Sequence, residues 1–345
     1  MTNDTLARPA LLALLLFLLA IASWEIYLRH DGANNAYDDS PSLWAHARTQ
    51  VYQPEDKSTV FIGSSRIKFD LDIPTWKELT GDIPVQLACV GSSPLPVLYD
   101  LAKDTCFKGK LVIDVTEGLF FSTNDGNRQR PNDGLKYYHG ITPAQRASFV
   151  INKPMEASLV FLDKENYSLN ALLDKLELKS RPGVFMAPIF PRDFDRTYFE
   201  RQSSMRPAFV ADTVQQNKQK SIWKLFASGP HKPPINGAPL DSILQTIKVA
   251  IDQIKSRGGE IVFVRTPSSD FYWAGEQKGF PREKYWDKLL ADTGCKGMHF
   301  MDYPETNHYK CPEASHLSPR DGIDYTHHLA NYLEKEIGWK FPKSF

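Results

Sequence analysis

Five short apolar runs, separated by segments long enough to form helices, constrain the fold of this chain more than any other feature. The runs are rich in Val, Ile, Leu and Phe, and they lie at 58–63, 85–90, 110–115, 260–265 and 298–302. Helical patterns fall between and after them, at about 94–106, 240–257, 283–291 and 319–337. Strands that alternate with helices form parallel sheets through right-handed crossovers. The sequence therefore predicts an α/β fold with a doubly wound parallel sheet.

The last helix has clear start signals. Ser318 is a natural N-cap residue, Pro319 suits the first helical position, and Asp321 favours the positive end of a helix. Residues just before this helix are expected at the rim of the sheet, and they include His316.

The stretch from 119 to 239 interrupts the alternation. It is rich in Pro, Asn, aromatic and charged residues, and it contains short helical patterns such as those at about 143–151 and 169–178. Because it is too long for an ordinary loop, we interpret it as an insertion packed over one end of the sheet. Aromatic groups within it are candidates for stacking on glycan rings, with core packing as the alternative role; they lie at 137–139, 190–194 and 198–199.

An apolar run at the amino terminus, from 9 to 28, is about long enough to cross a bilayer as a helix. Arg8 precedes it and Arg29 follows it, so the positive-inside rule favours a cytoplasmic amino terminus only weakly. We predict a cytoplasmic segment at 1–8, a transmembrane anchor at 9–28, a polar tether at 29–57 and a folded domain at 58–345.

Two alternatives to the anchor remain open. Ala20-Ile21-Ala22 resembles a small-residue cleavage site, so the run also fits a removed signal peptide. A buried hydrophobic helix is the other alternative. With either an anchor or a signal peptide, the rest of the chain is expected outside the cytoplasm, in the periplasm or at the cell surface.

Charge and cysteine content exclude two classes of protein. The formal net charge is +0 and Lys and Arg are spread along the chain, so no basic stripe indicates nucleic-acid binding. The four cysteines lack the spacing of a metal site. Cys295 and Cys311 flank the last strand, where a disulfide would stabilise the loop that follows, whereas Cys89 is expected to be a buried free thiol.

Two widely separated segments carry the candidate chemistry. Gly63-Ser64-Ser65-Arg66 follows the first apolar run, so its serines lie at the carboxyl edge of the sheet, where ligands bind in α/β folds. Glu313-Ala314-Ser315-His316-Leu317-Ser318 lies before the final helix. A serine nucleophile needs an adjacent base that is held in one tautomer by a third group. The second segment contains both a histidine and a carboxylate.

Each residue also has a structural interpretation. Ser65 is compatible with an ordinary turn or N-cap, and His316 with a structural hydrogen-bonding role. Asp302 and Asp321 are alternatives to Glu313 as the group that orients the histidine.

In these two segments the chain resembles the SGNH/GDSL hydrolase superfamily. The first block of that superfamily is Gly-Asp-Ser after the first strand, matched here by Gly63-Ser64-Ser65. Its last block is Asp-x-x-His-Leu-Ser followed by a glycine, matched by the segment from Glu313 to Ser318 with Gly322 after it. A middle block supplies a glycine after the second strand, where this chain has Gly91.

The resemblance covers about 58–115 and 260–333 and leaves the middle of the chain unassigned. It implies a flavodoxin-like SGNH fold and a catalytic triad of Ser65, His316 and Glu313. No metal or organic cofactor is required by this chemistry.

Three departures from the family pattern affect the site. Ser64 and Glu313 each stand where the family has Asp, and Thr116 follows the third strand where classical members have an asparagine that donates to the oxyanion. Loss of one oxyanion donor typically costs about a hundredfold or more in rate. We expect the backbone N–H groups of Ser65 and Gly91 to hold the oxyanion, with Thr116 or Arg265 as a side-chain candidate.

The Gly-Ser-Ser form and the absent asparagine look more like the membrane-anchored SGNH-like proteins related to alginate O-acetylation and teichoic acid D-alanylation. This resemblance implies an acyl donor, a glycan or polymer acceptor of the cell envelope, and a polytopic membrane acyltransferase as a possible partner. Arg66 and Arg265 are candidates for substrate binding at the same rim, with surface or ion-pair roles as the alternative.

The expected function is serine-dependent acyl transfer by an O-acyltransferase or O-acylesterase. The sequence leaves open whether a glycan hydroxyl or water resolves the acyl-enzyme. A rival from another class is a non-catalytic SGNH scaffold that binds or assembles an envelope-modification complex, because a fold does not guarantee chemistry.

Overall fold

A computed structural model describes residues 4–52, 57–174, 176, 188–191, 193–228 and 233–343. The chain forms two compact units. The anchor unit combines 1–38 with 142–189, and the sheet unit combines 39–141 with 190–345. Parts of several predicted segments lie outside the described residues. They are 1–3 of the cytoplasmic segment, 53–56 of the tether and 344–345 of the folded domain. Within the insertion they are 175, 177–187, 192 and 229–232, which include the end of its second helical pattern.

The sheet unit is built on a five-stranded parallel sheet, which confirms the predicted α/β class. The strands are β1 (Ser58–Ile62), β2 (Ile83–Gln86), β3 (Lys110–Asp114), β6 (Glu260–Arg265) and β7 (Lys296–His299), and neighbouring strands all pair in parallel. Two strands differ from the predictions. β2 begins and ends earlier than the predicted run of 85–90, since the strand stops at Gln86. β7 differs from the prediction of 298–302, because the chain leaves the sheet after His299 and forms a 3-10 turn, η6 (Phe300–Asp302).

The strand order is β2-β1-β3-β6-β7, so its direction reverses between β1 and β3. In open parallel sheets, ligands bind outside the carboxyl ends of the strands at such a reversal. Ser65 follows β1 and Thr116 follows β3, so both lie beside it.

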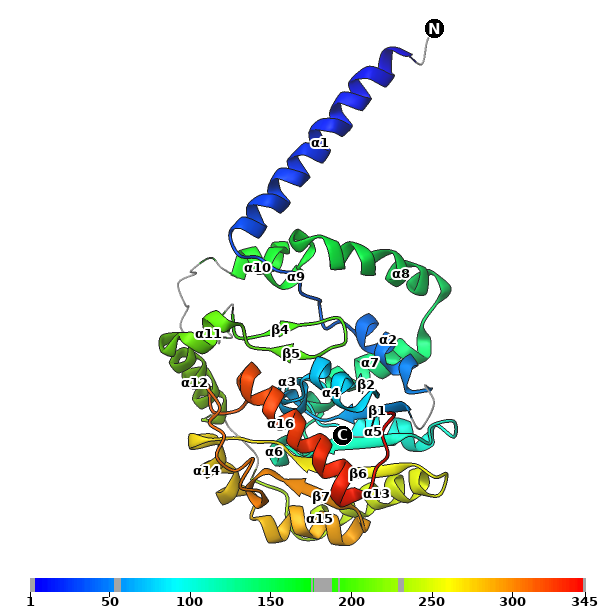
Figure 1. Ribbon diagram of the computed structural model, residues 1–345, viewed down its shortest axis with the longest axis vertical. Coiled ribbons are helices and arrows are strands. Elements are labelled where there is room, and N and C mark those ends of the chain that lie inside the picture. The colour runs from blue at the N-terminus through cyan, green and yellow to red at the C-terminus, as the bar shows by residue number, and fades with distance from the viewer. Residues whose placement is uncertain are drawn as a thin grey trace. The chain divides into compact units, whose positions relative to one another are not determined.

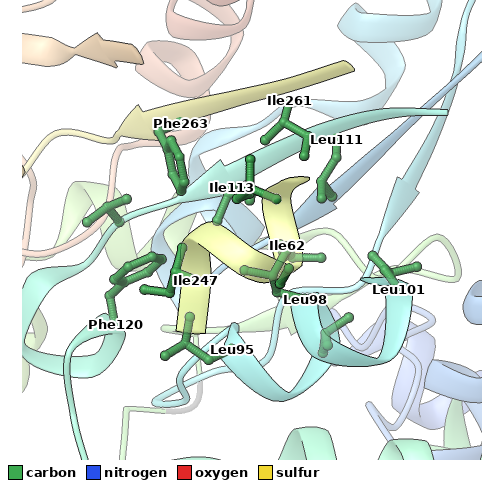
Figure 2. Packing of buried hydrophobic residues seen from close by; sticks show 14 of the residues in the cluster. Ile62, Leu95, Leu98, Leu101, Leu111, Ile113, Phe120, Ile247, Ile261 and Phe263 are labelled. Carbon is green, nitrogen blue, oxygen red and sulfur yellow. The ribbon is translucent and has the colours of Figure 1, made fainter. Parts of the chain in front are cut away.

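Successive side chains of each strand enter different hydrophobic layers. Val60 and Ile62 belong to one buried cluster, whereas Phe61 between them belongs to another. This period of two is expected of a strand that is covered on both faces. Figure 2 shows the first cluster, in which Leu98 and Ile247 pack against Ile113 of the central strand.

Helices cover both faces of the sheet (Figure 1). The first cluster takes residues from α5 (Leu95–Lys103), α13 (Ala238–Lys255) and α15 (Trp286–Thr293). The second takes residues from α3 (Ser65–Asp70), α4 (Ile73–Thr80) and α16 (Pro319–Tyr332). Further elements of this unit include η1 (Gln50–Tyr52), α6 (Glu117–Phe120), η3 (Asp125–Arg128), α14 (Asp270–Gly279), η5 (Arg282–Lys284) and η7 (Leu333–Ile337).

The start of α16 is confirmed as the sequence predicts. The Ser318 hydroxyl accepts a hydrogen bond from the Asp321 N–H at 3.2 Å, and Pro319 occupies the first turn. This cap ends the preceding loop at a defined point, which places His316 two residues before the N-cap.

The segment predicted as a polar tether is partly folded. It contains α2 (Pro41–Thr49), whose Trp44 is buried and donates its indole N–H to the Leu87 carbonyl at 3.0 Å. A Cβ at Gly134, in α7 (Gln129–Gly140), would lie 2.7 Å from the Trp44 ring, so a glycine is needed for this close approach. The segment from 29 to 57 therefore contains a helix that its polar composition did not predict, and this helix contributes Trp44 to the core.

The predicted insertion at 119–239 is divided between the two units. Its first part and its last part fold with the sheet, where they form α7, the two-stranded hairpin β4 (Arg196–Thr197) and β5 (Ser203–Ser204), α11 (Pro207–Ala211) and α12 (Thr213–Ala227). The part from 142 to 189 folds instead with the amino-terminal helix.

The anchor unit contains α1 (Asp4–His30), of which Ala7–His30 is long and apolar enough to cross a membrane. The predicted span of 9–28 lies within it. Only 11% of its most apolar window is buried, so the alternative of a buried core helix is wrong. The unit also contains α8 (Pro143–Ser158), η4 (Val160–Leu162), α9 (Lys164–Tyr167) and α10 (Leu169–Asp174).

All four cysteines are free thiols. The disulfide expected between Cys295 and Cys311 is wrong, because the two residues lie in the two different hydrophobic layers. Cys89 is buried and free, as predicted.

Candidate active site

Ser65, His316 and Glu313 form a continuous hydrogen-bonded row. The Ser65 hydroxyl lies 2.8 Å from His316 Nε2, and His316 Nδ1 lies 3.0 Å from Glu313 Oε1. An ionised carboxylate only accepts hydrogen bonds, so Nδ1 carries the ring proton and Nε2 is left to accept the serine proton. The structure thus brings together the three residues that the sequence singled out, and Glu313 occupies the orienting position rather than Asp302 or Asp321.

The turn after β1 positions Ser65 as the first residue of α3. Ser64 caps this helix, since its hydroxyl accepts from the Arg66 N–H at 3.4 Å. The same hydroxyl lies 2.7 Å from Thr116 Oγ1 and is buried, so Ser64 is held away from the surface. A Cβ at Gly63 would lie 2.6 Å from the Asp114 Cβ, which explains the glycine. Of the two serines, only Ser65 reaches the histidine and is partly exposed.

Helix α3 also holds the histidine loop in place. Its last residue, Asp70, accepts a hydrogen bond from the Leu317 N–H at 2.9 Å. One short helix therefore carries the serine at its first position and a tether for the histidine loop at its last. Burial raises the pKa of Asp70 well above its usual value, and its other carboxyl oxygen has no hydrogen-bond partner among the described residues.

Glu313 shapes the loop as well as the imidazole. Its Oε1 accepts the backbone N–H groups of Ser315 at 3.2 Å and His316 at 2.6 Å, in addition to the ring. Ala314, between Glu313 and Ser315, has φ +81°, a left-handed conformation that costs a non-glycine residue about 1–2 kcal/mol. The strain is offset because the turn brings three donors to one carboxylate oxygen.

Trp223 provides a further hydrogen bond to Glu313. Its indole N–H donates to Glu313 Oε2, the oxygen that the histidine does not use. Burial opposes ionisation of Glu313, but His316 and the hydrogen bonds from His316 and Trp223 hold its pKa below the usual value. Sequence reasoning missed Trp223, because α12 lies in the unassigned middle of the chain and carries no motif.

Aromatic rings enclose the imidazole of His316. The ring centroids of Phe69, Phe194 and Trp223 lie 4.4, 5.8 and 6.2 Å from its own, and His316 is only 2% exposed. Phe194 was a candidate for glycan stacking, but it is buried in a cluster with Phe69. Phe190, another of the candidates for glycan stacking, is 41% exposed.

The two arginines proposed for substrate binding lie beneath the site as parts of a buried ion network. Arg66 and Arg265 are 1% and 0% exposed, and both pair with Glu276 of α14. Arg265 also pairs with Glu117. Both guanidinium groups are buried and paired with these carboxylates, although Arg66 Nη1 has no hydrogen-bond partner among the described residues, so the structure gives no support to a substrate-binding role for them.

The expected oxyanion groups are only partly placed. The backbone pairing of β1 and β2 continues beyond the strands through a hydrogen bond from the Cys89 N–H to the Gly63 carbonyl at 3.2 Å. Gly91 therefore follows Cys89 along the same edge on which Ser65 follows Gly63. Gly91 has φ +61°, which favours glycine.

Thr116 is less suited to the oxyanion than the sequence suggested. Its hydroxyl donates to Asp114 Oδ2 at 3.1 Å and lies beside the Ser64 hydroxyl. A hydroxyl has one proton to donate, and Asp114 already accepts it. Thr116 therefore orders the Ser64 cap instead of facing the Ser65 hydroxyl as a free donor.

No protein-family model matches the chain, and no curated protein matches it significantly. Within the described part of the chain, no cluster of three or more His, Cys, Asp or Glu side chains is arranged to hold a metal ion. The row from Ser65 to Glu313 places a hydroxyl beside an imidazole that a carboxylate orients.

Proposed function

We propose that the protein is a membrane-anchored, extracytoplasmic enzyme of SGNH type that transfers or hydrolyses O-acyl groups on a cell-envelope glycan or polymer. The observation that carries the proposal is the row from Ser65 through His316 to Glu313. The strand order supports it, since counting only the parallel strands it reads 2-1-3-4-5, the order of flavodoxin-like sheets.

In the first half of the reaction, His316 Nε2 takes the proton of Ser65 as Oγ attacks the carbonyl carbon of an acyl ester. The Ser65 and Gly91 backbone N–H groups stabilise the oxyanion. Collapse of the tetrahedral intermediate breaks the ester C–O bond, and the imidazolium gives its proton to the departing oxygen. Glu313 stabilises the imidazolium throughout.

In the second half, the hydroxyl of a glycan or of water gives its proton to His316 and attacks the acyl-enzyme. The Ser65–acyl bond breaks, and His316 returns the proton to Ser65. A glycan acceptor makes the protein a transferase, and water makes it an esterase. A polytopic membrane acyltransferase is the proposed source of the acyl group in the first case.

Labelling with a fluorophosphonate tests the proposal, because this reagent reacts with activated serines. We expect an adduct on Ser65 that is lost in Ser65→Ala and His316→Ala but persists in Ser92→Ala, a serine of the similar turn after β2. Hydrolysis of an acetyl ester should follow the same pattern. Equal turnover by Ser65→Ala and the native protein would refute the mechanism.

The rival function is a non-catalytic scaffold for an envelope-modification complex. It is favoured by the engagement of Thr116 with Asp114 and Ser64, which leaves backbone groups as the expected oxyanion donors. Folded native protein that takes no label from the fluorophosphonate would support this rival.

A further inference from the structure

Two helices of the anchor unit turn apolar stripes outward. In α8, five exposed apolar residues are spaced by three and four positions, so they form a stripe along one face of the helix; they are Ala147, Val150, Ile151, Pro154 and Met155. Val150 and Ile151 are 69% and 62% exposed. In and just after α10 the same spacing recurs in four exposed leucines: Leu169, Leu172, Leu173 and Leu176.

The opposite side of α8 is polar, although that is the side the protein partly covers. Gln145, Lys153 and Glu156 are half-buried there, with Phe149 the one apolar member of the group. A surface helix of a water-soluble protein normally buries its apolar stripe and exposes its polar face. This arrangement is reversed in α8, which indicates that its outward face meets an apolar medium.

Hydrogen bonds join the end of α8 to the carboxyl-terminal end of α1. The Glu25 carboxylate accepts the Val160 and Phe161 N–H groups at 3.0 and 3.3 Å, just after α8. Arg29 donates to the Ser158 carbonyl at 2.9 Å. Asn35 Nδ2 donates to the carbonyl of Ala157 at 2.8 Å. Figure 1 shows α8 extending sideways from the foot of α1.

Exposed aromatic residues lie on α1 close to the hydrogen bonds that join it to the end of α8. Trp24 and Tyr27 are 50% and 59% exposed and stack with ring centroids 5.7 Å apart. Exposed Trp and Tyr at the end of an apolar helix are typical of the membrane–water interface. At about 1.5 Å per residue, the helix from Ala7 to Trp24 covers about 27 Å, close to the roughly 30 Å of a hydrocarbon core. Glu25, and with it the end of α8, therefore lies at the interface.

We propose that α8 and α10 are interfacial helices that lie on the membrane surface and insert their outward apolar stripes among the lipid acyl chains. The proposal rests on membrane anchoring by α1, which forms part of the proposed function. The anchor unit then contacts the membrane through α1, α8 and α10, and the Glu25 and Arg29 bonds join α1 to the end of α8. Amphipathic helices with such a face bind the boundary between headgroups and acyl chains.

Spin labelling of the full chain in phosphatidylcholine and phosphatidylglycerol vesicles tests this proposal. Cys106 is the one exposed native cysteine, so Cys106→Ser provides the background. Labels are placed one at a time at Val150→Cys, Ile151→Cys and Leu172→Cys. The controls are Asn152→Cys, on another side of α8, and Val249→Cys, an exposed apolar position in the sheet unit.

We expect labels on the stripes to collide several-fold more with dissolved oxygen, relative to a water-soluble nickel chelate, than labels at either control position. Stripe labels as open to the chelate as Asn152→Cys would overturn the proposal. So would labels that are open to the chelate in lipid vesicles but shielded from both reagents in native membranes, because a protein would then cover the stripes.

Extraction with alkaline carbonate separates failure of the anchor from failure of the interfacial helices. Protein that stays in the membrane pellet while its stripe labels remain in water retains the α1 anchor and contradicts only the inference about α8 and α10. Release of the native protein by carbonate would overturn both. Fluorophosphonate labelling of Ser65 is independent of either result.

Discussion

The indole of Trp223 and the imidazole of His316 share the carboxylate of Glu313, one on each oxygen. Glu313 is completely buried, and a carboxylate in that position is costly unless its lone pairs are satisfied. Trp223 therefore acts on the serine through Glu313, as a positioning residue. It also links α12, far from the matched motifs, to the triad.

Trp223→Phe is expected to lower kcat/KM by about tenfold to a hundredfold, since a hydrogen bond to a charged group contributes about 1.5–3 kcal/mol. Removal of this donor also raises the pKa of Glu313, so the acidic limb of the pH–rate profile should move to higher pH. Steady-state kinetics on an acetyl ester across pH measures both effects. Phe226→Leu, a change on the same helix, is the control, and an unmoved acidic limb would deny the link to Glu313.

Glu313→Gln should retain the loop but lose the carboxylate that holds the imidazole tautomer. The equivalent change in a serine protease triad lowers kcat about 10⁴-fold, and we expect a loss of at least about a hundredfold here. Glu313→Asp keeps the charge with a shorter reach, so its loss should be smaller. Rates of fluorophosphonate labelling rank the variants, and equal loss in both would argue against an electrostatic role.

Glu276 should make the native state sensitive to acid. Burial opposes its ionisation, but Arg265 and Arg66 lower its pKa to about 2. A lowered carboxyl pKa stabilises the fold above the unfolded value of about 4.3, and this stability is lost as pH falls towards the folded value. Glu276→Gln leaves the buried Arg66 without its carboxylate partner and Arg265 with Glu117 alone, which costs about 3–5 kcal/mol at neutral pH.

Urea unfolding at a series of pH values measures this difference. The gap between the native protein and Glu276→Gln should narrow steadily below about pH 4.3, where the unfolded carboxyl begins to protonate. Glu283→Gln, at an exposed position, should show no such narrowing. A gap that stays constant down to pH 3 would contradict the assigned ion pairs.

Asp70 should behave in the opposite sense. Burial raises its pKa well above the usual value, so its contribution to stability is fully present below the unfolded value of about 3.9 and is lost as pH rises through the folded value. Asp70→Asn keeps an acceptor for the Leu317 N–H without a titratable group. It should equal or exceed the native protein in unfolding free energy at pH 7.

Asp70→Ala removes the acceptor itself. It should lower kcat more than it changes KM, because the histidine loop loses its tether to α3 while the serine stays in place. If Asp70→Asn lowers kcat as much as Asp70→Ala does, an acceptor for the Leu317 N–H is not enough. The ionised carboxylate would then be needed, which would contradict a neutral Asp70 in the folded protein.

The sequence by itself determined the parts of this protein that depend on neighbouring residues. Short apolar runs that alternate with helical patterns predicted the strands, and Ser318 with Pro319 predicted the start of α16. The Gly63-Ser64-Ser65 turn and the segment from Glu313 to His316 predicted three members of the site, since a strand end and an N-cap place such residues at one rim. The polar composition of 41–49 gave no comparable signal for α2, because that helix is stabilised by Trp44 in a distant core.

Only the tertiary structure decided which distant groups surround those residues. Trp223 and Glu313 are 90 positions apart, and Arg66 and Glu276 are 210 apart, so no local pattern relates them. The structure moved the arginines from the proposed substrate site into a buried ion network, and it directed the stripe of α8 outward. Packing decides these outcomes, because the role of a side chain depends on which groups surround it in the folded protein. Those neighbours are set by the whole fold and not by the local sequence.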